Sequence, residues 1–172
     1  MPNRISSTIC FFLIAVPGCP APSDPAPEPP PPIGPQLLEI EGSFAIEGCA
    51  SSRLYRDGRR VQYQCFDSQG AFSWDNRGTL TESASAALDS ELASAALDAT
   101  TPVNHKGLCG APDSGGEVSL WVGEERVSFA PFCLFEGIVA LYDQVAAILF
   151  EIEGCEEPFA QLESVDPGCR AY

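Results

Sequence analysis

The chain has 172 residues, 24 of them acidic and 9 basic, so its formal net charge at pH 7 is −15. A surface of this sign repels phosphate backbones and anionic lipid faces, which argues against nucleic acid as a partner. The stretch 36–172 has the length of one ordinary domain.

The first 18 residues have the features of a secretory signal peptide. Arg4 is their only charged side chain, and an uncharged apolar run extends from Ile9 through Val16. This run is too short to cross a membrane, which takes about 20 apolar residues. Residues 1–18 are therefore expected to direct export and to be removed.

The sequence around the expected cleavage site, Val16-Pro17-Gly18-Cys19, resembles the lipobox of bacterial lipoproteins. A branched residue stands three positions before the cysteine and a small residue one before it, while Pro17 departs from the usual pattern. In that family the cysteine is acylated and becomes the new amino terminus. The resemblance thus implies lipidation at Cys19 and a membrane anchor. The alternative is an ordinary signal peptide whose removal leaves Cys19 as a plain thiol.

Residues 19–35 are predicted to be a tether with nine prolines. Proline fixes φ and lacks an N–H, so this run is expected to form an extended polyproline II spacer of roughly 50 Å. The alternative is a ligand for a proline-recognising domain. Pro20 follows Cys19 where an inner-membrane retention signal would place Asp. The lipoprotein resemblance therefore implies an outer-membrane or cell-surface protein with its domain outside the cytoplasm.

The eight cysteines suggest a disulfide framework. Cys10 leaves with the signal peptide and Cys19 would be lipidated, so six remain in the folded part. An even number in an exported chain predicts three disulfides, and six cysteines allow fifteen arrangements. The predicted pairs are Cys49–Cys65, Cys109–Cys133 and Cys155–Cys169. Their spacing does not match a zinc site, so no metal is expected.

The first half of the domain has the pattern of consecutive strands. Residues 36–48 alternate between two faces, one with Leu38, Ile40, Phe44 and Ile46 and the other with Glu39, Glu41, Ser43 and Glu47. Residues 53–66 are predicted to form a hairpin with a three-residue loop, Arg56-Asp57-Gly58, and this pairing brings Cys49 near Cys65. Another strand is expected over residues 71–74, ending at the turn signal Asn76-Arg77-Gly78.

Two helices and a second hairpin are predicted in the rest of the domain. Residues 81–98 form an alanine- and leucine-rich helix that Thr81 or Ser83 can cap. Alternating residues on either side of Gly123-Glu124 predict a hairpin, and apolar residues at helical spacing predict a helix over 136–154 with Gly154 as its C-cap. Residues 155–172 read as a polar, turn-rich tail. This order predicts a disulfide-stapled α+β fold, an antiparallel sheet with two helices packed on one face.

The sequence offers little that suggests catalysis. His105 is the only histidine, and no hydrolase nucleophile motif accompanies it. Residues 113–117 contain oxygen ligands and glycines but not the spacing of a calcium loop. We therefore predict no catalytic residue, no cofactor, no metal and no enzyme activity.

Five arginines fall within 25 residues, on or near the first predicted hairpin: Arg53, Arg56, Arg59, Arg60 and Arg77. Arginines guard an edge hairpin against aggregation and balance nearby acids. The alternative is that Arg53, Arg56, Arg59 and Arg60 dock a carboxylate-bearing partner.

The order of elements over residues 71–152 resembles emfourin-type inhibitors of metalloproteases. The similarity lies in the order of elements and in the segments Gly78-Thr79-Leu80-Thr81, Ser119 to Val122 and Val127-Ser128-Phe129. The six cysteines and the tail depart from that pattern. Two functions follow as predictions. The first is a lipid-anchored envelope protein with a non-catalytic domain that binds an envelope or secreted protein. The second is a small protein inhibitor of a secreted metalloprotease.

Overall fold

The computed structural model describes residues 27–42, 49–97, 102–104, 116–130 and 133–171. Within these ranges β1 to β4, β6, β7 and β9 form one antiparallel sheet in the order β7-β6-β1-β2-β3-β4-β9, and β5 pairs with β8. The elements in chain order are β1 (Gln36–Gly42), β2 (Ser51–Asp57), β3 (Arg60–Phe66), β4 (Phe72–Leu80), α1 (Glu82–Ser94), β5 (Pro102–Asn104), β6 (Gly116–Val122), β7 (Glu125–Phe129), β8 (Cys133–Phe135), the 3-10 turn η2 (Glu136–Ile138), α2 (Val139–Gly154) and β9 (Leu162–Val165).

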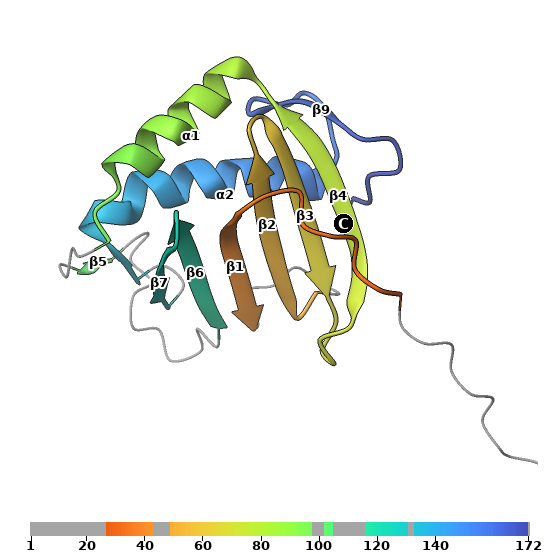
Figure 1. Ribbon diagram of the computed structural model, residues 1–172, viewed down its shortest axis with the longest axis horizontal. Coiled ribbons are helices and arrows are strands. Elements are labelled where there is room, and N and C mark those ends of the chain that lie inside the picture. Colours follow the sequence, from red (N-terminus) through yellow and green to blue (C-terminus); the bar gives the residue numbers. More distant parts are fainter. Residues whose placement is uncertain (1–26, 43–48, 98–101, 105–115, 131–132, 172) are drawn as a thin grey trace, which may run out of the picture.

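Both helices cover one face of the sheet, which we call the helix face (Figure 1). α2 crosses behind the strands in this view, and α1 packs against α2 and β4. The core fills the space between helices and sheet, and its largest buried side chains include Leu38, Leu54, Tyr63, Leu80, Leu88, Leu120, Ile138, Leu141, Ile148 and Ile152. This arrangement confirms the predicted α+β fold.

The helices follow the predicted apolar patterns but differ at their ends. Five apolar side chains of α2 are buried, which contributes on the order of 10 kcal/mol before the entropy of ordering is subtracted. α2 extends through Gly154, and Cys155 rather than Gly154 takes the left-handed conformation that ends the helix. α1 starts at the predicted cap Thr81 but ends at Ser94, because the N–H of Ala96 donates to the Gly137 carbonyl instead of continuing the helix.

Both predicted hairpins are present. Strand pairing in the first continues to Asp57 and Arg60, so its loop is the two-residue turn Gly58-Arg59 and not the predicted three-residue loop. Gly58 has φ +57°, which suits glycine at the first position of a tight hairpin turn. The second hairpin turns at Gly123, as predicted.

The predicted end of the strand over residues 71–74 is wrong. β4 continues through Asn76, Arg77 and Gly78 to Leu80, and β9, which the sequence patterns did not reveal, pairs with its second half. The reason is close approach rather than a turn: a Cβ on Gly78 would lie 2.9 Å from the Ser164 carbonyl oxygen. Glycine at this position lets β9 pack onto β4.

Two of the three predicted disulfides are observed. Cys49 bonds to Cys65, joining the start of β2 to β3, and Cys155 bonds to Cys169, closing the tail after α2. The third predicted pair includes Cys109, which lies outside the described residues, as do His105 and the entire predicted signal peptide with Cys19.

The opposite face of the sheet, which we call the open face, carries part of the proline-rich segment. In Figure 1 the chain leading into β1 crosses in front of β2, β3 and β4. Its backbone accepts hydrogen bonds from Gln64 at Pro30 and from the Arg56 N–H at Pro35, and the Ile33 N–H donates to Gln62. This differs from the expectation of a spacer that stands free of the domain as far as residue 35.

Candidate functional site

The predicted arginines do not gather into one surface. Arg53 and Arg56 lie on the same strand an odd number of residues apart, so Arg53 lies on the open face and Arg56 on the helix face. Arg53 forms an ion pair with Glu39, with 2.8 Å between Nε and Oε1. Arg77 on β4 forms one with Asp75, at 2.9 Å.

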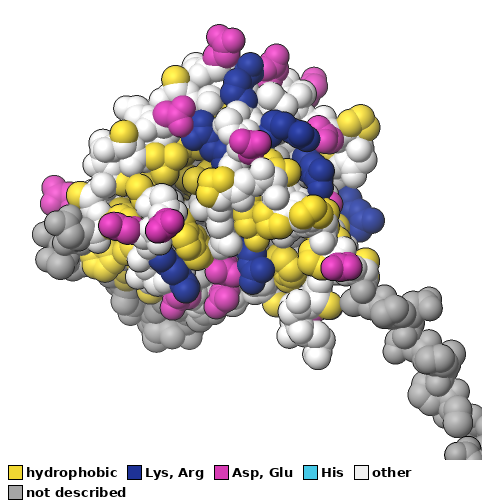
Figure 2. Space-filling model, in the orientation of Figure 1, with side chains coloured by type: hydrophobic (Ala, Val, Ile, Leu, Met, Phe, Trp, Pro, Cys, Tyr) yellow, Lys and Arg dark blue, Asp and Glu magenta, His cyan; other side chains and the backbone are white. Residues whose placement is uncertain are grey.

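Arg59 and Arg60 lie at the β2–β3 turn. Arg59 donates to the Leu80 carbonyl at 2.8 Å and forms an ion pair with Glu163. Arg60 is exposed, and no ion pair is found for it within the described part of the chain. Figure 2 shows basic side chains on this side of the molecule interleaved with acidic ones. This pattern favours charge balance, and docking of a carboxylate-bearing partner on these arginines stays a prediction.

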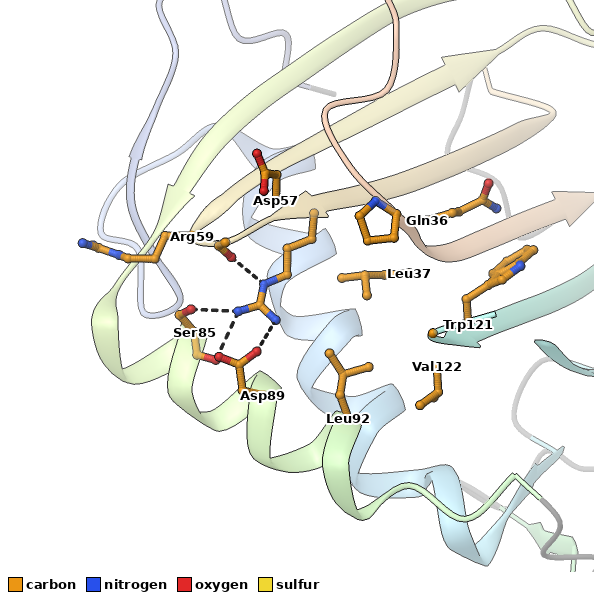
Figure 3. A pocket seen from close by; sticks show the side chains of 13 residues that line it. Gln36, Leu37, Asp57, Arg59, Ser85, Asp89, Leu92, Trp121 and Val122 are labelled. Atoms are coloured by element: carbon orange, nitrogen blue, oxygen red, sulfur yellow. Dashed lines mark hydrogen bonds and ion pairs between the residues drawn. The ribbon is translucent and has the colours of Figure 1, made fainter. Parts of the chain in front are cut away.

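A groove opens at the end of the sheet beside α1, and we call it the end groove (Figure 3). Its volume is about 430 Å³, and it is lined by residues 35–37, 56–59 and 121–123 and by Ser85, Asp89 and Leu92 of α1. Figure 3 shows Leu37, Leu92, Trp121 and Val122 around one end and charged side chains at the other. A space of this size with an apolar wall and a polar rim suits one or two side chains of a ligand.

Arg56 forms the polar end of the groove and joins β2 to α1. Its guanidinium donates from Nε to the Gly58 carbonyl (2.6 Å), from Nη1 to Asp89 (2.6 Å) and from Nη2 to the Ser85 hydroxyl (2.8 Å). The hydrogen bond from Arg56 lowers the pKa of the Asp89 carboxyl. Most of the guanidinium donors thus form hydrogen bonds with neighbouring groups. Arg56 therefore shapes the groove and has few donors left to bind an anionic ligand.

Gln36, one of the residues beside the groove, carries an unsatisfied polar atom. Its Nε2 is buried and has no hydrogen-bond partner in the described structure. A buried donor without a partner carries a desolvation cost. Figure 3 shows the Gln36 side chain directed away from Leu37 and Leu92, so the groove itself presents its apolar wall to a ligand. This wall matches an apolar side chain.

Most residues of this groove were not singled out by sequence patterns. Leu37, Leu92, Trp121 and Val122 read there as ordinary core or strand residues, and only Arg56 and Arg59 stood out as possible binding residues. Leu37 is 5% exposed although it breaks the alternation that buries Leu38, because the register of β1 on β2 shifts between Gln36 and Leu38. A sequence pattern does not reveal such an irregularity.

A half-buried carboxyl, that of Glu153, lies on the helix face, outside the end groove. Burial in the last turn of α2 raises the pKa of Glu153 from 4.5 to about 8, and a hydrogen bond with the Tyr63 hydroxyl partly opposes this. Tyr63 is fully buried, and its hydroxyl also lies 3.7 Å from Cys49 Sγ, in the disulfide to Cys65. Glu153 is therefore expected to stay protonated near neutral pH.

No group of three or more His, Cys, Asp or Glu side chains in the described ranges is placed to hold a metal ion. None of the helices in those ranges is both long and apolar enough to span a bilayer. Compared with known protein families, curated proteins and solved structures, the chain shows no significant match.

Proposed function

We propose that the protein is an exported, lipid-anchored envelope protein whose domain binds another polypeptide without acting on it chemically. The proposal of export and lipid anchoring rests on residues 1–18 and the lipobox-like stretch ending at Cys19. The binding role rests on one observation above others, the end groove with its apolar wall beside a polar rim. The occupant that fits is an apolar side chain that packs against Leu37, Leu92 and Val122.

The test is photo-cross-linking from the groove in the native host. A photoreactive residue at position 92, on the groove wall, is compared with one at position 93, which is exposed and turned about 100° away on α1. We expect a discrete polypeptide adduct from position 92 only, lost when Trp121 is changed to Asp. Adducts of equal yield from both positions, or none from position 92, would refute binding at the groove.

The lipid anchor is tested separately. The protein recovered from the membrane fraction is expected to begin at Cys19 and to carry the added mass of acyl chains. Cys19→Ser is expected to move the protein into the aqueous fraction. A native chain that retains residues 1–17, or that has an unmodified thiol at its amino-terminal residue, would refute the lipid anchor. The proposal of binding at the groove would not be affected.

Inhibition of a secreted metalloprotease is the alternative form of this binding role. It predicts that the purified mature chain slows cleavage of a peptide substrate in proportion to its concentration. If the groove is the contact, Leu92→Asp abolishes the slowing and Ala93→Asp, at the exposed neighbouring position, keeps it. Cleavage that proceeds at the same rate with and without the protein would discard this alternative.

A further inference from the structure

The proline-rich segment contacts the open face at positions three residues apart. Pro30 and Ile33 are half-buried, whereas Pro31 and Pro32 between them are exposed. Polyproline II has three residues per turn, so positions 30 and 33 lie on the same side of such a segment. We call residues 30–35 the strap. One side of the strap faces the sheet and the other faces solvent.

Two glutamines of β3 form hydrogen bonds with the side of the strap that faces the sheet. Gln64 Nε2 donates to the Pro30 carbonyl at 2.8 Å, and Gln62 Oε1 accepts from the Ile33 N–H at 3.1 Å. Gln62 and Gln64 are buried, at 0% and 2% exposure, although they point away from the core. Ile33 is the first residue after four prolines that has an N–H to give. Gln64 and Gln62 therefore recognise a proline carbonyl and, three residues later, a backbone N–H.

Gln62, which accepts from Ile33, is also held by hydrogen bonds that do not involve the strap. Gln62 Nε2 donates to Asp75 Oδ2 at 3.1 Å, and the same oxygen accepts from Arg77 Nε at 2.9 Å. This chain of bonds turns Gln62 Oε1 toward the strap. We call Gln62, Gln64, Asp75 and Arg77 the polar row.

The two ends of the strap are held differently, by the β2 backbone at Pro35 and by a single side chain, Gln64, at Pro30. At its C-terminal end the Pro35 carbonyl accepts from the Arg56 N–H at 3.0 Å, and a Cβ on Gly34 would lie 2.1 Å from the Arg56 carbonyl oxygen. At the other end residues 27–29 are exposed. The contacts at Pro30 and Ile33 can therefore open without disturbing β1.

We propose that the polar row is a binding site for an extended proline-rich polypeptide, which the strap occupies in cis and a proline-rich segment of a partner occupies in its place. Proline fixes the backbone before binding, so an extended segment loses little conformational freedom when it docks. Two side-chain hydrogen bonds hold the strap against such a competitor. This site is on the open face and does not depend on the end groove or on the lipid anchor.

The first test uses the mature chain with Cys19→Ser and residues 29–33 replaced by Gly and Ser at equal length, which frees the polar row. The probe is a synthetic peptide of residues 27–35, and the side-chain amide signals of Gln62 and Gln64 are followed by NMR. We expect a saturable shift, and weaker binding by about threefold or more after Gln64→Met. The control Gln69→Met, at an exposed turn, leaves binding unchanged.

A peptide with Ile33→Pro lacks the N–H that Gln62 accepts and is expected to bind at least threefold more weakly. The chain with its own strap is expected to bind the probe at least tenfold more weakly than the freed chain, because the cis segment competes at high effective concentration. No saturable shift in the freed chain, or equal binding of the two peptides, would overturn the proposal.

A second measurement covers the case in which the replaced chain does not fold. In the chain with its own strap, exchange of the Ile33 amide hydrogen is expected to be slower than in the free peptide. Gln62→Met is expected to speed it by about two- to tenfold, the effect of one hydrogen bond, while Gln69→Met leaves it unchanged. Exchange as fast as in the free peptide would show that the strap is not bound and would equally overturn the proposal.

Discussion

Replacing Glu153 with Gln is expected to remove a large pH dependence of stability. In the folded protein burial raises the pKa of Glu153 to about 8, from 4.5 in the unfolded chain. Below pH 4.5 the carboxyl is protonated in both states and has no effect. Between the two values only the unfolded chain releases the proton, so stability falls as pH rises, by about 1.4 kcal/mol per pH unit. Above pH 8 the loss is complete.

The total loss is on the order of 5 kcal/mol, since the two pKa values differ by about three and a half powers of ten. This is a large part of the roughly 5–15 kcal/mol by which a domain of this size is stable. Glutamine has nearly the shape of the protonated acid and does not ionise. E153Q is therefore expected to match the wild type at pH 4 and to exceed it by several kcal/mol at pH 9.

Urea denaturation from pH 4 to 9, followed by tryptophan fluorescence, measures the difference between the two proteins. E156Q is the matched control, because Glu156 is exposed three residues further on and its loss changes the net charge equally. Its stability is expected to stay within about 0.5 kcal/mol of the wild type. If the wild-type and E153Q stabilities stay parallel over this range, the carboxyl is not buried as described and the reasoning fails.

Three further predictions concern the C-terminal part of the sheet. Gly78→Ala places a Cβ 2.9 Å from the Ser164 carbonyl; it is expected to cost about 1–3 kcal/mol in urea denaturation and to speed amide exchange in β9 before β4. The Glu151 carboxylate accepts four hydrogen bonds from three consecutive backbone N–H groups before and within β9. Glu151→Ala is expected to cost about 2–4 kcal/mol, and an unchanged denaturation midpoint would count against this anchor. Replacing Cys155 and Cys169 with Ser opens a loop of 14 residues; a thermal scan is expected to show a loss of about 3 kcal/mol, and a loss near zero would contradict a stabilising role.

Local patterns predicted much of the fold. The apolar repeat of α2 needs only its own residues, because side chains three and four apart share one side of a helix. The turn glycines Gly58 and Gly123 likewise act through their own backbone conformation. The bond between Cys49 and Cys65 followed from hairpin pairing over a short separation.

Long-range packing decided what the patterns missed. Gly78 looked like a turn because glycine is common in turns, yet it is a point where β9 approaches β4. Arg56 looked like part of an exposed basic surface, and its contacts with Ser85 and Asp89 join residues about thirty positions apart. Neither role changes the local periodicity, so neither leaves a signal in the sequence.

The same distinction applies to both proposed sites. By itself the amino-acid order determined an acidic α+β domain behind a proline-rich segment, because charge, chain stiffness and periodicity are properties of neighbouring residues. Only the tertiary structure decided that the strap lies on Gln62 and Gln64 and that Leu37 and Leu92 line one groove. These contacts depend on which distant segments the sheet brings together, and that is settled by packing of the whole domain.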